Sequence, residues 1–131
     1  MIQVTAAIVV ESGKVLIARR NPTARLANMW EFPGGKIEPG ESPEQCLKRE
    51  LYEEFEIHVR IGERVGASVY DYDFGRVELI AFKARLVGGS FKLHDHAEIR
   101  WVEADVLDRF EFAPADIPFV DMIRSGRIPI K

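Results

Sequence analysis

Residues 35–57 read GKIEPGESPEQCLKRELYEEFEI, a glycine-containing loop followed by the strongest helix pattern in the chain. Ser42 and Gln45 have the spacing of a capping box, and Pro43 suits the first position of a helix. Apolar residues then recur every four positions, at Leu47, Leu51 and Phe55. This period predicts a helix that begins after Ser42, ends near Phe55 and packs one face against a core.

Three glutamates share another face of this helix. Glu50, Glu53 and Glu54 stand at i, i+3 and i+4, where side chains on a helix are neighbours. Like charges at this spacing disfavour an isolated helix by roughly 0.2–0.5 kcal/mol per pair, so a ligand that offsets them is expected. Mg²⁺ is the natural candidate, because hard divalent cations prefer oxygen ligands. The alternative is a solvated acidic face with one Arg49–Glu53 ion pair.

The same stretch resembles the Nudix box, in which Gly is followed after five residues by Glu, and after seven more by Arg-Glu-aliphatic-x-Glu-Glu-x-Gly-aliphatic. The matching residues are Gly35, Glu41, Arg49, Glu50, Leu51, Glu53, Glu54 and Ile57. Glu56 replaces the glycine with which the family ends its helix in a left-handed conformation. Either Glu56 adopts that conformation at a cost on the order of 1 kcal/mol, or the helix ends differently.

The resemblance implies a hydrolase that uses Mg²⁺, or Mn²⁺ as a substitute, to cleave a nucleoside diphosphate linked to another group. The metal-holding groups that it implies on this segment are Gly34, Gly35, Glu50, Glu53 and Glu54. One of the glutamates would also be the general base, and in MutT-like members the position of Glu50 is favoured. Arg49 would join helix and loop through Glu41 or Glu53. The expected catalytic set is therefore Glu50, Glu53 and Arg49.

The segment His94-Asp95-His96-Ala97-Glu98 carries further metal-ligating residue types. Two histidines and two acids so close together could bind zinc. We favour a loop beside the active site instead, in which Asp95 or Glu98 supplies one more carboxylate to Mg²⁺, as a loop acid does in the Nudix family. A solvated loop is the remaining alternative.

The resemblance extends along nearly the whole chain, to the MutT-like branch and to bacterial CTP pyrophosphohydrolases. Two segments carry it, Trp30–Glu38 and Phe112–Pro118. It implies a substrate-binding set of Arg20, Arg25, Phe32, Arg76 and Asp116. Arg20 would bind phosphate, Phe32 would touch the base, and Asp116 would read the base edge. The alternatives are a strand-end charge for Arg20, a core residue for Phe32 and a helix cap for Asp116.

The remaining sequence predicts strands that alternate with helices. The expected strands are Ile2–Val10, Val15–Ala18, Ile57–Ile61, Ala67–Tyr72, Val77–Leu86 and Ile99–Val102, with an extended Trp30–Pro33 and a turn at Gly88-Gly89. Two more helices are expected at Glu103–Arg109 and Ala115–Arg124. This pattern predicts an α/β fold with a mixed β-sheet covered by helices, in a single domain of residues 1–131. The resemblance implies a Nudix-type α/β/α sandwich.

The composition limits the kinds of molecule that the protein is expected to bind. A net charge of −3 argues against binding a nucleic-acid polymer, which needs a basic face, and leaves a small nucleotide as the expected partner. No apolar run approaches the length of a membrane span, and the start of the chain lacks the pattern of a secretory signal. The single cysteine, Cys46, excludes an internal disulfide. We therefore expect a cytoplasmic monomer or homodimer without membrane partners.

Three functions are compatible with these patterns. The first is a nucleoside triphosphate pyrophosphohydrolase that acts on CTP-like or oxidised nucleotides. The second is a hydrolase of nucleotide sugars or dinucleoside polyphosphates. The third is a non-catalytic nucleotide sensor, a role in which Nudix-like domains commonly lose their carboxylates. The complete set Glu50, Glu53 and Glu54 favours an enzyme.

Overall fold

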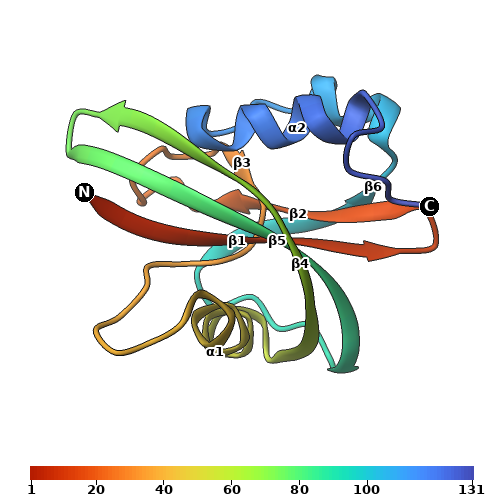
Figure 1. The fold of residues 1–131 in the computed structure, drawn as a ribbon, viewed down its shortest axis with the longest axis horizontal. Coiled ribbons are helices and arrows are strands. Elements are labelled where there is room, and N and C mark those ends of the chain that lie inside the picture. Colours follow the sequence, from red (N-terminus) through yellow and green to blue (C-terminus); the bar gives the residue numbers. More distant parts are fainter.

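The computed structural model describes all residues, Met1–Lys131, as a mixed sheet between two helical layers (Figure 1). The strands are β1 (Ile2–Glu11), β2 (Lys14–Arg20), β3 (Trp30–Glu31), β4 (Ile57–Tyr72), β5 (Gly75–Gly89) and β6 (His96–Val102). The α-helices are α1 (Pro43–Phe55) and α2 (Ile117–Arg124), and the 3-10 helices are η1 (Ala104–Arg109) and η2 (Pro114–Asp116). Helix α1 covers one side of the sheet and α2 the other, which confirms the predicted α/β/α sandwich.

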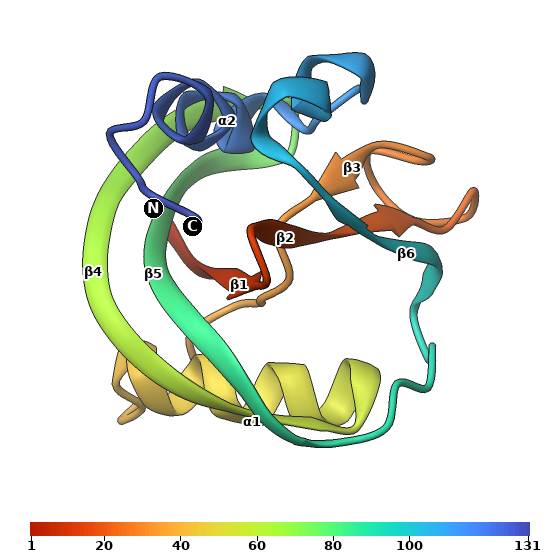
Figure 2. The same ribbon diagram turned by 90° about the vertical axis from the view of Figure 1, so that its right-hand side faces the viewer.

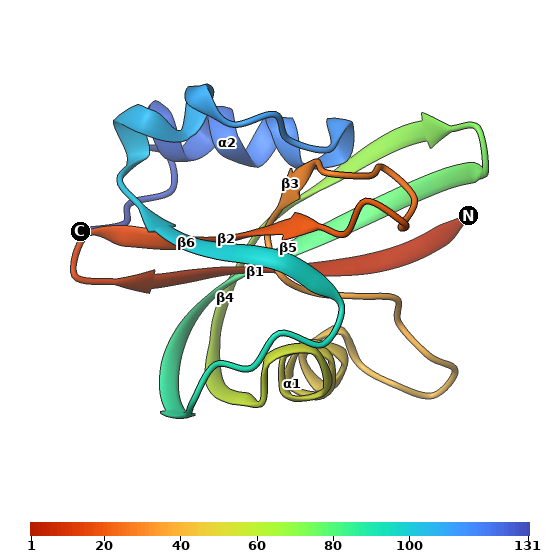
Figure 3. The ribbon, with the colours of Figure 1, turned by 180° about the vertical axis from the view of Figure 1, so that it is seen from behind.

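The sheet has the order β3-β2-β1-β5-β4, and β6 pairs with β2. Strands β1 and β5 are parallel, and the other pairs are antiparallel. Figure 2 shows β4 and β5 as a curved pair that runs from the α2 layer to the α1 layer. Figure 3 shows β6 beside β2, between the two helical layers. This pairing brings the segment around residue 96 next to the end of β2.

Two cores hold the layers together, one on each face of β1 and β2. Ala6, Ile8 and Val10 pack with α2, whereas Ala7 and Val9 pack with α1. Strand β1 therefore reads as a continuous apolar run, as expected for a central strand that is buried on both faces. None of the helices is long and apolar enough to cross a membrane.

Several expected boundaries were wrong. The strands predicted at Ile57–Ile61 and Ala67–Tyr72 form one strand, β4, because register shifts in the intervening residues keep it paired with β5. Gly88 and Gly89 end β5 and do not form a separate turn. The segment predicted as a helix at Glu103–Arg109 is the 3-10 helix η1.

The predicted C-terminal helix is also divided. Residues 114–116 form the 3-10 helix η2, and α2 begins only at Ile117. Pro118 explains the break, because it lacks the N–H that would bond to the carbonyl of Pro114 four residues earlier. Pro118 instead occupies the first turn of α2, where such a missing donor is tolerated.

Helix α1 begins and ends as a capped helix. The Ser42 hydroxyl accepts from the Gln45 N–H, and the Gln45 carboxamide accepts from the Ser42 N–H, which confirms the capping box. At the other end Glu56 itself is left-handed, with φ 56° and ψ 37°. The alternative of a different helix end was therefore wrong. The Glu56 carboxylate pairs with His94 at 2.7 Å, a contact that glycine could not make.

The left-handed Glu56 gives a first prediction. We expect Glu56→Gly to have a free energy of unfolding about 1 kcal/mol higher than Glu56→Ala, because only alanine has a Cβ that opposes this conformation. Both variants lose the His94 contact, so the difference between their free energies of unfolding isolates the cost of the left-handed backbone at position 56. Urea denaturation of the two proteins measures it. Equal stabilities would show that the helix end relaxes out of the left-handed region.

Candidate active site

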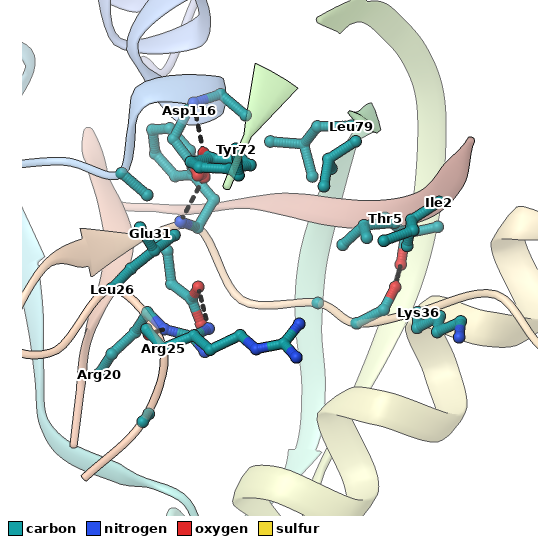
Figure 4. Close-up of a pocket in the computed structure, with 18 of the residues that line it drawn as sticks. Ile2, Thr5, Arg20, Arg25, Leu26, Glu31, Lys36, Tyr72, Leu79 and Asp116 are labelled. Atoms are coloured by element: carbon teal, nitrogen blue, oxygen red, sulfur yellow. Dashed lines mark hydrogen bonds and ion pairs between the residues drawn. The ribbon is translucent and has the colours of Figure 1, made fainter. Parts of the chain in front are cut away.

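A cavity of about 470 Å³ lies beside β1 and draws its walls from both helical layers. Figure 4 shows Arg20, Arg25 and Glu31 on one side of it, Asp116 and Tyr72 at another, and Thr5 and Lys36 opposite. Gly34, Gly35 and Glu54 also line it. Its volume lies in the range of small-molecule sites.

The loop after β3 is bound to β1 by its backbone. The Thr5 N–H donates to the Gly35 carbonyl at 2.8 Å, and the Ala7 N–H donates to the Pro33 carbonyl at 2.7 Å. A Cβ at Gly34 would lie 1.9 Å from the Thr5 carbonyl oxygen, so this close approach requires glycine. The Gly35 carbonyl also accepts from the Thr5 hydroxyl. It is therefore already occupied, and Gly34 is the better of the two predicted carbonyl ligands.

Gly35 makes room for the first helix glutamate. A Cβ at Gly35 would lie 2.2 Å from the Glu50 Cδ atom, so the carboxylate occupies the space that a side chain would need. The Glu50 side chain is thus held between α1 and the loop.

This contact gives a second prediction. We expect Gly35→Ala to lower kcat about 10²-fold, because the new methyl group displaces the Glu50 carboxylate by an ångström or more. The fold should persist, since the neighbour that must move is a side chain. Gly88→Ala is the matched control, because the nearest atom to its Cβ is 4.0 Å away. Full activity of Gly35→Ala would argue against a catalytic position for Glu50.

Arg49 joins the helix to the loop. Its Nε donates to Glu41 at 2.6 Å, and its Nη1 donates to Glu50 at 2.8 Å. Nη1 also lies 3.3 Å from Glu53, and Nη2 donates to the Lys36 carbonyl at 3.2 Å. The guanidinium holds the pKa of Glu41 down at about 2, chiefly through their hydrogen bond. Arg49 therefore contacts both Glu41 and Glu53 and fixes the orientation of Glu50.

Glu54 is the helix glutamate that faces the pocket. Its side chain is 12% exposed, against 56% for Glu53. Burial is the main cause that raises the pKa of Glu54 far above its ordinary value, followed by a hydrogen bond with Glu50 and the nearby Glu31 carboxylate. Its Oε2 atom is buried and has no hydrogen-bond partner. A buried carboxylate that lines the pocket fits a site for a cation, which would stabilise its charged form.

The carboxylates are not already assembled around a metal position. No three His, Cys, Asp or Glu side chains converge closely enough to form a ligand cluster by themselves. Glu50 and Glu54 nevertheless supply oxygens of the type that Mg²⁺ binds, and the Gly34 carbonyl accepts no hydrogen bond within the chain. These groups fit a cation that keeps several of its own waters, which is usual for Mg²⁺.

Pairing of β6 with β2 adds two residues that the sequence did not assign to the site. The Glu31 carboxylate accepts from Arg20 Nη1 at 2.9 Å and lies 2.7 Å from His96 Nε2. Arg20 Nε donates to the Arg25 carbonyl at 2.6 Å. Arg20, Arg25, Glu31 and His96 all line the pocket. No local pattern could have shown this, because Glu31 and His96 are 65 positions apart.

Asp116 closes the pocket near α2. It occupies the position before this helix but makes no side-chain cap bond, so the alternative of a helix cap was wrong. Its Oδ1 instead accepts from the Phe32 N–H at 3.1 Å. Burial raises the pKa of Asp116 well above its ordinary value, and Glu31 adds to this. Phe32 lines the pocket but is also buried against Phe112, so it belongs to the core as well.

Of the four other residues that were predicted for the site, two line the pocket and two lie outside it. Asp95 lines the pocket, and the Arg25 guanidinium lies 4.5 Å from the centre of the Phe74 ring, which lines it too. Arg76 is exposed and paired with Asp71 on the β4–β5 hairpin. Glu98 is held by Arg19 and Arg100. The structure therefore does not bring Arg76 or Glu98 to the pocket.

An acidic helix and a glycine loop, set below a nucleotide-sized pocket in a mixed sheet, define a class of hydrolases that cleave phosphate anhydrides. The chain belongs to the Nudix family, since the family model described as the NUDIX domain matches residues 1–123. It is therefore a Nudix hydrolase.

Named relatives cover most of the chain. It is 37% identical over 127 residues to the CTP pyrophosphohydrolase of Escherichia coli K12, covering 97% of this chain and 94% of that protein. It is also 37% identical over 126 residues to the putative 8-oxo-dGTP diphosphatase 2 of Mycobacterium tuberculosis H37Rv, covering 93% and 88%. The crystal structure of a MutT protein from Methanosarcina mazei Go1 superposes with a TM-score of 0.85 at 29% identity, covering 97% and 95%. The chain is a MutT-like pyrophosphohydrolase related to these enzymes.

Proposed function

We propose that the chain hydrolyses nucleoside triphosphates to a nucleoside monophosphate and pyrophosphate in a Mg²⁺-dependent reaction, with CTP, dCTP or oxidised nucleotides such as 8-oxo-dGTP as substrates. The observation that carries this proposal is one pocket lined by both Glu54 and Asp116. The buried Glu54 carboxylate suits a cation that binds phosphate, and the Asp116 carboxyl group suits the edge of a base. The two named relatives point to the same substrates.

The proposal assigns a role to each side chain near the metal site. Glu54, Glu50 and the Gly34 carbonyl would hold Mg²⁺. Asp95, which lines the same pocket, and Glu53, which precedes Glu54 on α1, would hold its bound water. When bound, Mg²⁺ neutralises phosphate oxygens and lowers the pKa of water. Arg49 Nη1 donates to the Glu50 Oε1 atom, which leaves Oε2 as the Glu50 oxygen available either to the metal or to a proton of the attacking water.

The nucleotide would be held from the other walls. Arg20 and Arg25 provide positive charge for the phosphate chain, and both line the pocket. The Asp116 carboxylate would accept a hydrogen bond from an exocyclic amine of the base. Tyr72 supports this wall, because its hydroxyl accepts from the Ala115 N–H at 2.9 Å.

Pyrophosphate release across a nucleotide panel, with and without Mg²⁺, tests the proposal. The panel holds CTP, dCTP, dGTP, 8-oxo-dGTP, ATP, ADP-ribose and a dinucleoside polyphosphate. We expect metal-dependent pyrophosphate from one or two triphosphates. Cleavage of ADP-ribose or the dinucleoside compound alone would assign a different substrate class. Binding of nucleotide with no cleavage of any compound would identify a sensor.

A further inference from the structure

His96 is a buried histidine that lies between two carboxylates. Its side chain is only 5% exposed, and its ring stacks on Phe55 with 5.0 Å between ring centres. Its Nε2 atom lies 2.7 Å from Glu31 Oε2, and its Nδ1 atom lies 3.4 Å from Glu54 Oε2. The ring therefore stands where β6 and α1 meet.

The contact between His96 and Glu54 joins two buried atoms that have no other partner. Glu54 Oε2 and His96 Nδ1 are the two buried side-chain atoms of the chain without a hydrogen bond. Each unpaired buried polar group costs about 1–3 kcal/mol, so a small movement that closes the gap between them is favoured. The stacked Phe55 ring and the strong Glu31 contact leave Nδ1 directed at Glu54.

The contact with Glu31 continues toward the nucleotide side of the pocket. Glu31 binds His96 through Oε2 and Arg20 through Oε1, the latter at 2.9 Å. Arg20, Glu31, His96 and Glu54 thus form one continuous chain of contacts across the pocket wall, which we call the His96 bridge. All four side chains line the pocket.

We propose that His96 is a positioning residue that holds the metal-binding Glu54 with its Nδ1 side and the nucleotide-binding Glu31–Arg20 pair with its Nε2 side. This inference rests on the proposed function. It makes the affinities for metal and for nucleotide depend on a single side chain that is only 5% exposed. Holding Oε2 of Glu54 leaves its Oε1 for a cation, and holding Oε2 of Glu31 leaves Oε1 for Arg20.

Two amide variants separate the two ends of the bridge. The side-chain nitrogen of Gln reaches the place of Nε2, whereas that of Asn reaches the place of Nδ1. We therefore expect His96→Gln to weaken Mn²⁺ binding about 10-fold and to leave CTP binding nearly unchanged. We expect His96→Asn to do the reverse. His94→Gln is the control, because His94 is exposed and contacts Glu56 at the helix end.

Both affinities are measured without turnover. Electron paramagnetic resonance gives the Mn²⁺ affinity without nucleotide, and calorimetry in EDTA gives the CTP affinity without metal. Circular dichroism checks that each variant is folded. If His96→Gln does not fold, His96→Asn alone tests the split, because it should retain Mn²⁺ affinity and lose CTP affinity.

The outcomes separate this inference from the proposed function. Wild-type protein that binds Mn²⁺ and CTP, together with variants that change neither affinity, would overturn the His96 bridge alone. Equal losses of both affinities in both variants would also overturn it, since that pattern belongs to a packing role. Wild-type protein that binds no Mn²⁺ would overturn the proposed function and the bridge together.

Discussion

Glu54→Gln is expected to lower kcat about 10³-fold or more and, at the same time, to stabilise the metal-free protein. The loss of activity follows from replacing a charged cation ligand by a neutral amide, which removes several kcal/mol of transition-state stabilisation. Glu50→Gln should have a similar effect on kcat, because Glu50 is held beside Glu54 by Arg49. Pyrophosphate release at saturating Mg²⁺ and nucleotide measures both.

The gain in stability follows from the burial of Glu54. Its pKa in the folded protein lies above the ordinary value of 4.5, so the folded state binds this proton more tightly than the unfolded state does. Stability of the metal-free protein therefore falls as pH rises above about 4.5 toward the folded pKa. Glutamine has no proton to lose, so Glu54→Gln should be more stable at pH 7.5, by about 1–3 kcal/mol.

Glu44→Gln is the matched control, since Glu44 is exposed in the first turn of the same helix. It should change neither kcat nor the dependence of stability on pH. Thermal unfolding in EDTA between pH 5 and pH 9 measures stability. Retained activity in Glu54→Gln would remove this residue from the metal site. Lost activity with lost stability would indicate a structural role instead.

Asp116→Asn is expected to change the ranking of bases by about 10- to 100-fold while leaving kcat for the best substrate within a few-fold. The substitution places an N–H donor where a carboxyl oxygen lay, and a base group left opposite a mismatched partner in this buried wall costs about 1–3 kcal/mol. Asp116 Oδ1 is occupied by the Phe32 N–H, so its other oxygen is the one available to a base. The ratio of kcat/KM for CTP and 8-oxo-dGTP measures the change.

The same substitution should flatten the dependence of stability on pH. Because burial raises the folded pKa of Asp116 above its ordinary value of 3.8, wild-type stability falls as pH rises above that value. Asparagine removes this loss and can still accept from the Phe32 N–H. Asp121→Asn is the control, because Asp121 is exposed on α2. An unchanged base ranking would return Asp116 to a purely structural role.

Local features of this chain could be predicted because their causes are local. The capping box of Ser42 and Gln45, the apolar period of α1 and the common face of its glutamates depend on residues at most four positions apart. Strand β1 could also be predicted from the sequence, because its residues are apolar and rich in β-branched side chains. These patterns, with the family motif that they resemble, determined the sandwich fold, the acidic helix and the glycine loop.

Tertiary structure decided which residues meet in the pocket. His96 reaches Glu31 and Glu54 because β6 pairs with β2 at Arg20, a contact across 76 positions that no local period encodes. The same pairing places Glu98 in an ion pair with Arg19, and the β4–β5 hairpin places Arg76 in an ion pair with Asp71. Glu98 and Arg76 therefore lie outside the pocket, contrary to the prediction. Asp116 likewise accepts from the distant Phe32 N–H and does not form the helix cap that was its alternative role. Sequence determined the helix that carries the carboxylates, whereas the register of distant strands determined their partners, because that register is set by packing of the whole sheet.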